Sequence, residues 1–171
     1  MGKGKIVSDG DRIAVFGPPG VGKTSLIAKL TSNNFTETYT PTFVTTIQNT
    51  KLEFAKELGV RVYMFDLPGG HLFQQFTTPY LSISKLAILM YSVEDLGSFE
   101  EVSTWAGYCD SNRVKIILVA NKAETSQKLI SFQMGKSKAK EINAFFIETS
   151  VKTGKNIAQL SRLLSYLIIQ N

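Results

Sequence analysis

A glycine-rich segment that directly follows a short apolar run constrains this chain more than any other feature. The run Arg12–Phe16 has the apolar, β-branched character of a buried strand, and residues 17–24 after it read GPPGVGKT. This segment satisfies the pattern G-x-x-x-x-G-K-[ST] between a predicted strand and a predicted helix. Such a loop points successive backbone N–H groups at phosphate oxygens, and the helix start adds a favourable dipole. The sequence therefore predicts a site for a nucleoside triphosphate.

The individual residues of this segment have expected parts in that site. Gly20 and Gly22 allow the backbone to curl, because glycine adopts conformations that other residues avoid. Lys23 would reach the β- and γ-phosphates, and the Thr24 hydroxyl would ligate Mg²⁺. Pro19 has no N–H, and its ring would lie near the γ-phosphate, where it could crowd an approaching water or a partner's side chain.

One ordinary domain accounts for the length and composition of the chain. Its 171 residues, 43% of them hydrophobic, are enough to bury one core and too apolar for a disordered chain. No apolar run approaches the roughly 18 residues of a membrane span, and the first residues lack the features of a secretory signal. Cys109 is the only cysteine, which excludes an intrachain disulfide and a cysteine-rich zinc site. We expect a single domain over residues 1–171, soluble and cytoplasmic.

The net charge of +5 is unevenly distributed. Residues 1–127 carry 12 basic and 12 acidic side chains, whereas residues 128–171 carry 7 basic and 2 acidic ones. This asymmetry suggests an acidic partner surface or membrane headgroups, and a solvated basic face is the plain alternative. We expect a monomer with no nucleic-acid partner and a weak peripheral membrane contact through this basic C-terminal quarter.

Predicted strands alternate with predicted helices along the chain. Apolar runs predict buried strands at residues 12–16, 60–65, 86–91, 114–120 and 144–147, and a more polar edge strand at residues 42–54. Apolar spacing predicts helices at residues 98–108 and 160–168. Trp105 and the pair Phe145 and Phe146 are expected to be core residues. This alternation predicts an α/β fold with a mostly parallel sheet covered on both faces, which binds its ligand at the carboxyl ends of the strands.

Three further segments follow predicted strands, where ligand contacts are expected. They read DLPG at residues 66–69, NKAE at 121–124 and ETSVK at 148–152. Asp66 could hold Mg²⁺ through water, and Gly69 would let a backbone N–H reach the γ-phosphate. Each segment alone could be an ordinary turn, but their order after the glycine-rich loop favours a shared site.

At these residues the chain resembles the small GTPases of the Ras superfamily, and Rab proteins most closely. The segments FGPPGVGKTSL, DLPGG, NKAE and ETSVKTG are similar to the family's phosphate, Mg²⁺, guanine and ribose loops, and residues 35–42, FTETYTPT, are similar to its first switch with some Rho character. The resemblance covers nearly the whole chain. It implies a three-layer P-loop NTPase fold with a six-stranded sheet and about five helices.

The resemblance also implies bound GTP or GDP with Mg²⁺ and a role for each matching residue. The implied phosphate contacts are Gly20, Val21, Gly22, Lys23, Thr24, Ser25 and Gly69. The implied guanine and ribose contacts are Phe35, Tyr39, Asn121, Lys122, Glu124, Ser150, Val151 and Lys152. Mg²⁺ would be held by Thr24, by Thr42 when a γ-phosphate is present, and by Asp66 through water.

Two positions depart from the family pattern. Gly70 stands where the family has the glutamine that orients the attacking water, so hydrolysis is expected to be slow unless His71, one residue on, substitutes for it. Glu124 replaces an aspartate that accepts two hydrogen bonds from guanine. It keeps the carboxylate but shifts it by about 1.5 Å, which is expected to weaken guanine binding.

Three functional hypotheses follow. The first is a GTP-dependent molecular switch of vesicle trafficking that hydrolyses GTP slowly and meets effectors, exchange factors and GTPase-activating proteins through residues 35–46 and 66–80. The second is an interaction subunit that holds its nucleotide permanently and does not switch, which Pro19, Gly70 and Glu124 favour. A P-loop kinase or ATPase is disfavoured, because it would leave the NKAE and ETSVK segments unexplained.

Overall fold

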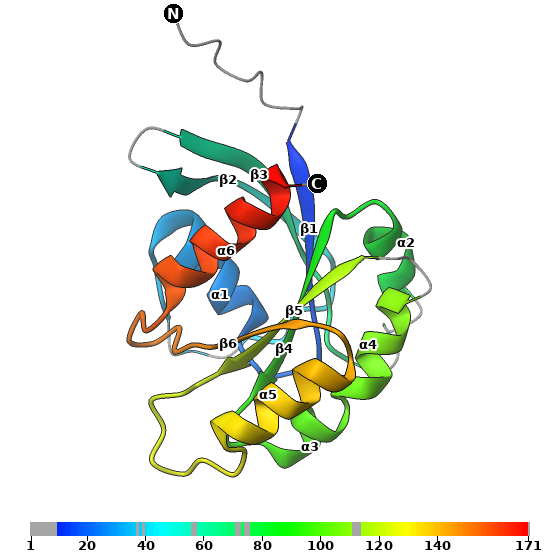
Figure 1. Ribbon diagram of the computed structural model, residues 1–171, viewed down its shortest axis with the longest axis vertical. Helices are drawn as coiled ribbons and strands as arrows, with labels where there is room; N and C mark the ends of the chain where they lie inside the picture. Colours follow the sequence, from blue (N-terminus) through cyan, green and yellow to red (C-terminus); the bar gives the residue numbers. More distant parts are fainter. Residues whose placement is uncertain are drawn as a thin grey trace, which may run out of the picture.

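The strand order places the glycine-rich loop near the middle of the sheet. The computed structural model describes residues 10–36, 38, 40–55, 58–70, 73, 76–110 and 114–170. In chain order the elements are β1 (Asp11–Phe16), α1 (Lys23–Ser32), β2 (Thr46–Ala55), β3 (Leu58–Asp66), α2 (Thr77–Ser82), β4 (Leu86–Ser92), α3 (Leu96–Glu100), α4 (Val102–Asp110), β5 (Lys115–Asn121), α5 (Phe132–Glu141), β6 (Phe145–Glu148) and α6 (Ile157–Ile169). Within the described residues, six strands form one sheet in the order β2-β3-β1-β4-β5-β6 (Figure 1).

The direction of the strands fixes where a ligand can lie. β2 and β3 are antiparallel, and every other pair of neighbours is parallel. β1 lies between β3 and β4. β2 and β3 lie on one side of β1, and β4, β5 and β6 lie on the other, so the strand order reverses at β1. A ligand crevice forms at such a reversal of strand order, so the loop after β1 opens into it.

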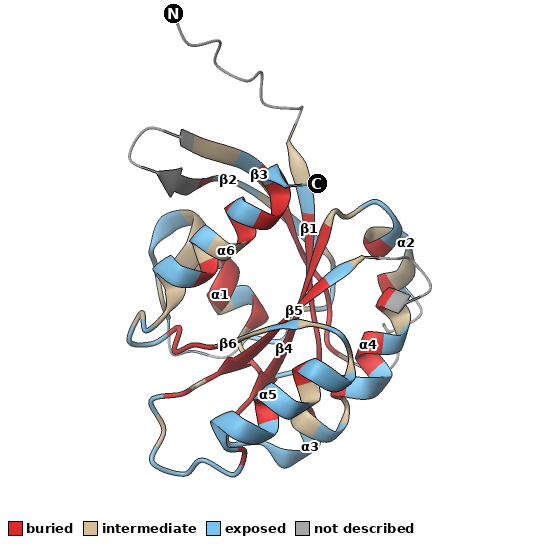
Figure 2. Ribbon diagram, viewed as in Figure 1, coloured by how far each residue is buried: buried red, intermediate tan, exposed pale blue. Residues whose placement is uncertain are grey.

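Helices cover both faces of this sheet. α1 and α6 pack on one face, where Leu26 and Leu160 join strand side chains in a buried apolar cluster. α2, α4 and α5 pack on the other face in a second cluster around Trp105, which is 0% exposed. Figure 2 shows buried strands at the centre and exposed outer helix faces. The predicted α/β class and mostly parallel sheet are confirmed.

The helix predicted at residues 98–108 is divided in two. Asp95 caps α3, since its side chain accepts a hydrogen bond from the backbone N–H of Ser98 at 3.2 Å. α3 ends at Glu100, and α4 begins two residues later at Val102. The apolar spacing continues across Glu101, so periodicity alone could not reveal the break.

The two edges of the sheet differ from their predictions. The first edge strand begins at Thr46, four residues later than predicted, because residues 42 and 43 line a cavity and strand pairing starts only opposite Asp66. The strand predicted at residues 144–147 is present as β6, but the prediction that it is buried was wrong. β6 is the other edge, and Phe145 is 45% exposed instead of lying in the core. An apolar run of this length is compatible with both a central and an edge strand.

Two smaller expectations can be compared with the structure. Cys109 lies in α4 and is only 1% exposed, which is the usual environment of a structural cysteine. None of the helices in the described part of the chain combines the length and the apolarity that crossing a membrane requires.

Candidate functional site

The loop after β1 curls at its glycines and encloses a lysine. Gly20 and Gly22 have φ angles of 75° and 98°, which glycine adopts without steric cost. The curl brings Lys23 back over the loop, where its Nζ donates to the carbonyl oxygens of Gly17 at 2.9 Å and Pro18 at 2.8 Å. The ammonium group is thus fixed beside the loop's backbone, at the start of α1.

The charge of Lys23 is nearly removed from solvent. Its side chain is only 6% exposed, and burial lowers its pKa to about 8, although the nearby Asp66 carboxylate opposes this shift. The group is therefore mainly protonated at neutral pH. A buried cation is stabilised strongly by a matching anion, which makes this position favourable for phosphate.

Oxygen atoms of Thr24 in α1, Asp66 at the end of β3 and Thr42 in the segment before β2 lie close together. The Thr24 hydroxyl donates to Asp66 Oδ2 at 2.7 Å and lies 3.0 Å from the Thr42 hydroxyl. Asp66 is 1% exposed, and its Oδ1 has no hydrogen-bond partner among the described residues. Burial raises the pKa of Asp66, against the hydrogen bond from Thr24 and the charge of Lys23. Hard oxygen donors with a spare buried carboxylate oxygen fit the coordination preferences of Mg²⁺.

Asn121 connects the phosphate loop to the end of β5. Its Nδ2 donates to the carbonyl oxygen of Val21 at 2.9 Å, and a Cβ atom at Gly22 would lie only 2.5 Å from the same nitrogen. Its Oδ1 accepts from the Val151 N–H at 3.2 Å and from the Thr149 hydroxyl at 3.3 Å. One buried amide thus joins the loops after β1, β5 and β6.

The segment after β3 touches the phosphate loop closely. A Cβ atom at Gly69 would contact Lys23 Nζ and lie 2.7 Å from Pro19 N, so only glycine fits there without displacing the loop. A Cβ atom at Gly70 would lie 3.2 Å from Cδ2 of Phe73 and meet nothing else within 4 Å except a second atom of that ring. Gly70 can therefore accept a side chain if Phe73 moves by a few tenths of an ångström.

These segments surround a cavity of about 710 Å³. Most of the predicted site residues line it: Gly20, Gly22, Lys23, Thr24, Ser25, Phe35, Thr42, Gly69, Gly70, Asn121, Lys122, Glu124, Val151 and Lys152. Val21, Asp66 and Ser150 are buried and do not line it. Tyr39 and His71 lie outside the described residues.

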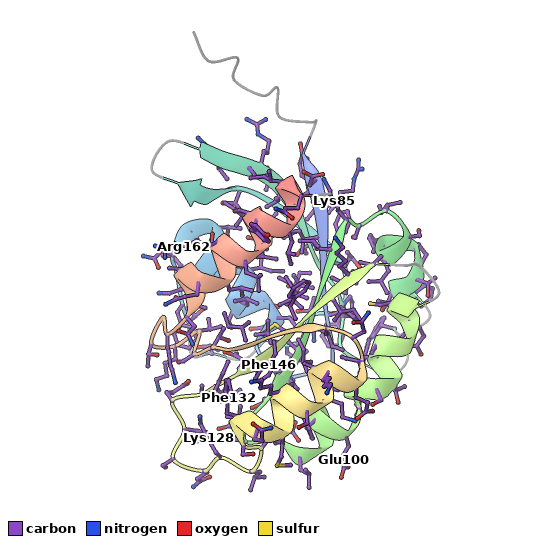
Figure 3. The ribbon with its side chains drawn as sticks, viewed as in Figure 1. Lys85, Glu100, Lys128, Phe132, Phe146 and Arg162 are labelled. Atoms are coloured by element: carbon purple, nitrogen blue, oxygen red, sulfur yellow. The ribbon has the colours of Figure 1, made fainter. Side chains whose placement is uncertain are left out.

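The end of the cavity away from the phosphate loop carries a positive and a negative side chain, Lys122 and Glu124. Glu124 is exposed at its rim. Lys122 has a left-handed backbone, with φ of 63°, and its Nζ lies 2.8 Å from Glu94 Oε1. Behind this end, Glu148 is 8% exposed and accepts from Lys128 at 2.9 Å. Figure 3 labels Lys128 beside the start of α5.

Three neighbours of the site were not predicted from the sequence. Ala28 lines the cavity one helical turn after Thr24, so helical periodicity could have indicated it. Phe73 lines the cavity next to Gly70, and Glu94 pairs with Lys122. Phe73 follows Gly70 by only three residues, and its backbone N–H donates to the Gly70 carbonyl oxygen at 2.9 Å. Only the Glu94–Lys122 contact joins segments that are separate in the sequence, so no local pattern marks Glu94.

Comparison with known proteins agrees with this geometry. The family model described as "Ras family" matches residues 12–169. The chain is also 31% identical over 165 residues to the Ras-related protein RabC of Dictyostelium discoideum, covering 90% of this chain and 81% of that protein. Members of the Ras family are GTP-binding switch proteins with GTPase activity, and the match to RabC agrees with the Rab-like motifs. On these grounds the chain belongs to the Ras family and is a Rab-like small GTPase.

Proposed function

We propose that the cavity binds GTP or GDP with its phosphates on the loop after β1 and its guanine between the loops after β5 and β6. The observation that carries this proposal is Asn121, which bonds both Val21 and Val151 and so joins the two halves of one continuous cavity. Backbone N–H groups of the loop, Lys23 and Ser25 would bind phosphate, and Gly69 would approach the γ-phosphate.

The base and ribose would occupy the other half of the cavity. Phe35 is half-buried against the core and faces the cavity, so its ring can pack on the base. Lys122 and Glu124 would frame the guanine, and the backbone at Val151 would meet its carbonyl oxygen. We also assign Ser150 and Lys152 to this end, and Tyr39 to closure over the phosphates.

Thr24 and Thr42 would hold Mg²⁺ directly, and Asp66 would hold it through water. When bound, Mg²⁺ neutralises charge on the β- and γ-phosphates. The hydroxyls of Thr24 and Thr42 are already 3.0 Å apart, so little rearrangement is needed to bring both to one ion.

The direct test identifies the bound nucleotide. Protein purified without added nucleotide is denatured, and the released nucleotide is identified by chromatography; stripped protein is then titrated with GDP and ADP, with Mg²⁺ or EDTA. The proposal requires guanine nucleotide in the extract, preference for GDP over ADP and weaker binding in EDTA. Equal affinity for ADP would contradict it.

We further propose that the protein switches by ordering its surface on GTP and presents it to effectors, exchange factors and GTPase-activating proteins. Support comes from large apolar side chains that are exposed in two segments, and one of these side chains, Phe43, also lines the cavity. Phe43 is 68% exposed, Val44 72% and Phe76 58%, within residues 35–46 and 66–80. Large exposed apolar side chains, such as the adjacent Phe43 and Val44, favour a protein partner.

Hydrolysis is proposed to be slow because Gly70 has no side chain to orient the attacking water. Gly70→Gln should therefore raise the single-turnover rate of GTP hydrolysis by about 10- to 100-fold, the range that correct positioning of a reactant can give. The backbone there accepts a side chain, since its Cβ atom would meet only the Phe73 ring.

Gly107→Gln is the matched control, because a Cβ atom there meets nothing within 4 Å and the position lies on α4. Phosphate release is measured from GTP-loaded protein. An unchanged rate in Gly70→Gln would show that the missing glutamine does not limit hydrolysis, and would leave a contribution from His71 to be tested by His71→Ala.

The longer side chain of Glu124 is proposed to weaken guanine binding. Glu124→Asp should slow GDP release by about tenfold, because one well-placed charge-assisted hydrogen bond is worth roughly 1.5–3 kcal/mol. Release of a fluorescent GDP analogue is followed after mixing with excess GDP. Identical release from both proteins would show that the loop already compensates for the extra methylene.

A non-switching interaction subunit is the second candidate function. The observation that favours it is the close approach of Gly69 to Pro19, which leaves little space for an attacking water. In addition, Gly70 has no side chain that could position this water. The two functions differ in exchange: a switch replaces GDP with GTP and changes conformation, whereas a permanent nucleotide-bound subunit does neither.

We also propose a weak membrane contact of a monomeric protein through its basic C-terminal quarter. Lys128 and Lys138 pair with Glu148 and Glu141, so the proposed contact rests on the exposed Lys136 and Lys140 of α5. Exposed charges act weakly in salt, and any such contact is secondary to nucleotide binding.

A further inference from the structure

An acidic residue after β4 holds the lysine at the base end of the cavity. Lys122 Nζ and Glu94 Oε1 are 2.8 Å apart, and each side chain is 36% exposed. Lys122 lines the cavity, whereas Glu94 does not. The pair therefore lies at the cavity wall, where the carboxylate can act on the lysine without meeting a bound base.

The backbone around Glu94 is firmly attached to the base end. The Val93 N–H donates to the carbonyl oxygen of Asn121 at 3.0 Å, and the Val93 carbonyl accepts from the N–H groups of Leu129 and Ile130 at 2.9 and 3.0 Å. The next residue, Asp95, is occupied as the cap of α3. Glu94 is thus fixed in position, with its side chain directed to Lys122.

An acidic partner such as Glu94 restricts the Lys122 ammonium group, whose position the backbone conformation alone does not determine. The φ of 63° at Lys122 is a left-handed conformation that non-glycine residues adopt rarely, and the side chain beyond it has four rotatable bonds. An unpaired lysine on the rim would sample many rotamers, and binding a nucleotide would then require ordering it.

We propose that Glu94 is a positioning residue for the guanine end of the site: it anchors the Lys122 ammonium so that the methylene stem stays along the cavity wall and slows nucleotide release. This inference rests on the proposed function of the cavity. Glu94 pairs with Lys122 and is not among the described residues that line the cavity, so its effect should be the same for GDP and GTP.

The test is the release of fluorescent GDP and GTP analogues from wild-type protein and Glu94→Gln, which keeps the shape and removes the charge. At about 20 mM KCl, release from the variant should be about 1.5- to 5-fold faster, the range for a partly exposed ion pair. The ratio should fall towards one at about 0.5 M KCl, because salt screens the pair in the wild type.

Two further variants separate positioning from general loosening. Glu100→Gln is the matched control, since Glu100 is an exposed carboxylate on the nearby α3 (Figure 3) and should leave release unchanged. Lys122→Gln removes the other partner, and adding Glu94→Gln to it should cause no further acceleration.

The outcomes decide between the claims. Release unchanged or slowed by Glu94→Gln, an effect that persists at high salt, or an effect that persists in the Lys122→Gln background would each overturn the role of Glu94. If the wild-type protein itself retains no guanine nucleotide, the proposed function fails instead.

Discussion

Lys23→Met is expected to lower the affinity for GDP and GTP by at least about 100-fold. Lys23 Nζ is held over the phosphate loop by the carbonyl oxygens of Gly17 and Pro18, and its charge is almost fully buried. Each charge-assisted hydrogen bond from such a group to phosphate is worth about 1.5–3 kcal/mol, so the loss of two gives at least this factor.

The folded protein should tolerate this substitution when no nucleotide is bound. Methionine fills the space of the lysine stem and removes the cost of burying a charge, while the two carbonyl oxygens lose a donor. These effects oppose each other, so the melting temperature without nucleotide should change little. The stabilisation by GDP and Mg²⁺ should fall by at least about 2.7 kcal/mol at saturating ligand, since it depends on the affinity.

Lys29→Met provides the control, because Lys29 lies on the same helix and its Nζ makes an exposed 3.4 Å contact with the Asn33 carbonyl oxygen. Melting curves with and without GDP, and fluorescence titrations, measure both quantities. Wild-type affinity in Lys23→Met would mean that the phosphates bind elsewhere than on this loop.

Asn121→Ala should both destabilise the protein and accelerate nucleotide release. The substitution leaves the Val21 carbonyl oxygen and the Val151 N–H without their buried partner, at a cost of about 1–3 kcal/mol for each group. We therefore expect a loss of about 2–4 kcal/mol in the free energy of unfolding and release at least about 100-fold faster, because the guanine contact is lost together with the link to the phosphate loop.

Asn49→Ala is the matched control on the exposed side of β2 and should leave both quantities near their wild-type values. Urea denaturation without nucleotide gives the first quantity, and release of the fluorescent GDP analogue gives the second. Fast release without any loss of stability would show that Asn121 acts on the base alone and does not join the two loops.

The sequence predicted the phosphate side of the site well because its signals are local. Three glycines, a lysine and a threonine stand among the eight positions that follow the strand ending at Phe16, and the structure gives that segment the curl its glycines allow. The α/β class was equally predictable, since each central strand is a compact apolar run. The other loops were located by their order along the chain.

The remaining features depend on contacts between distant segments. Phe145 resembles a core residue in its apolar run, but its exposure follows from the edge position of β6, which no local pattern encodes. The sequence does not distinguish Glu94 from other surface acids. Its role depends on the pairing of β4 with β5, which brings the residues after the two strands together. The start of β2 differs from its predicted position for the same reason: Thr42 contacts Thr24 of α1 instead of pairing in the sheet.

The edge position of β2 has a mechanical consequence for a nucleotide-dependent switch. β2 has a single neighbour, β3, whereas β1 is bonded on both sides. The segment carrying Thr42 leads directly into β2, so a change there needs to break hydrogen bonds to one strand only. β1, which carries the phosphate loop, stays clamped between two. The fold thus places the phosphate loop on a central strand that is held on both sides, and Thr42 on a segment whose strand is held on one side only.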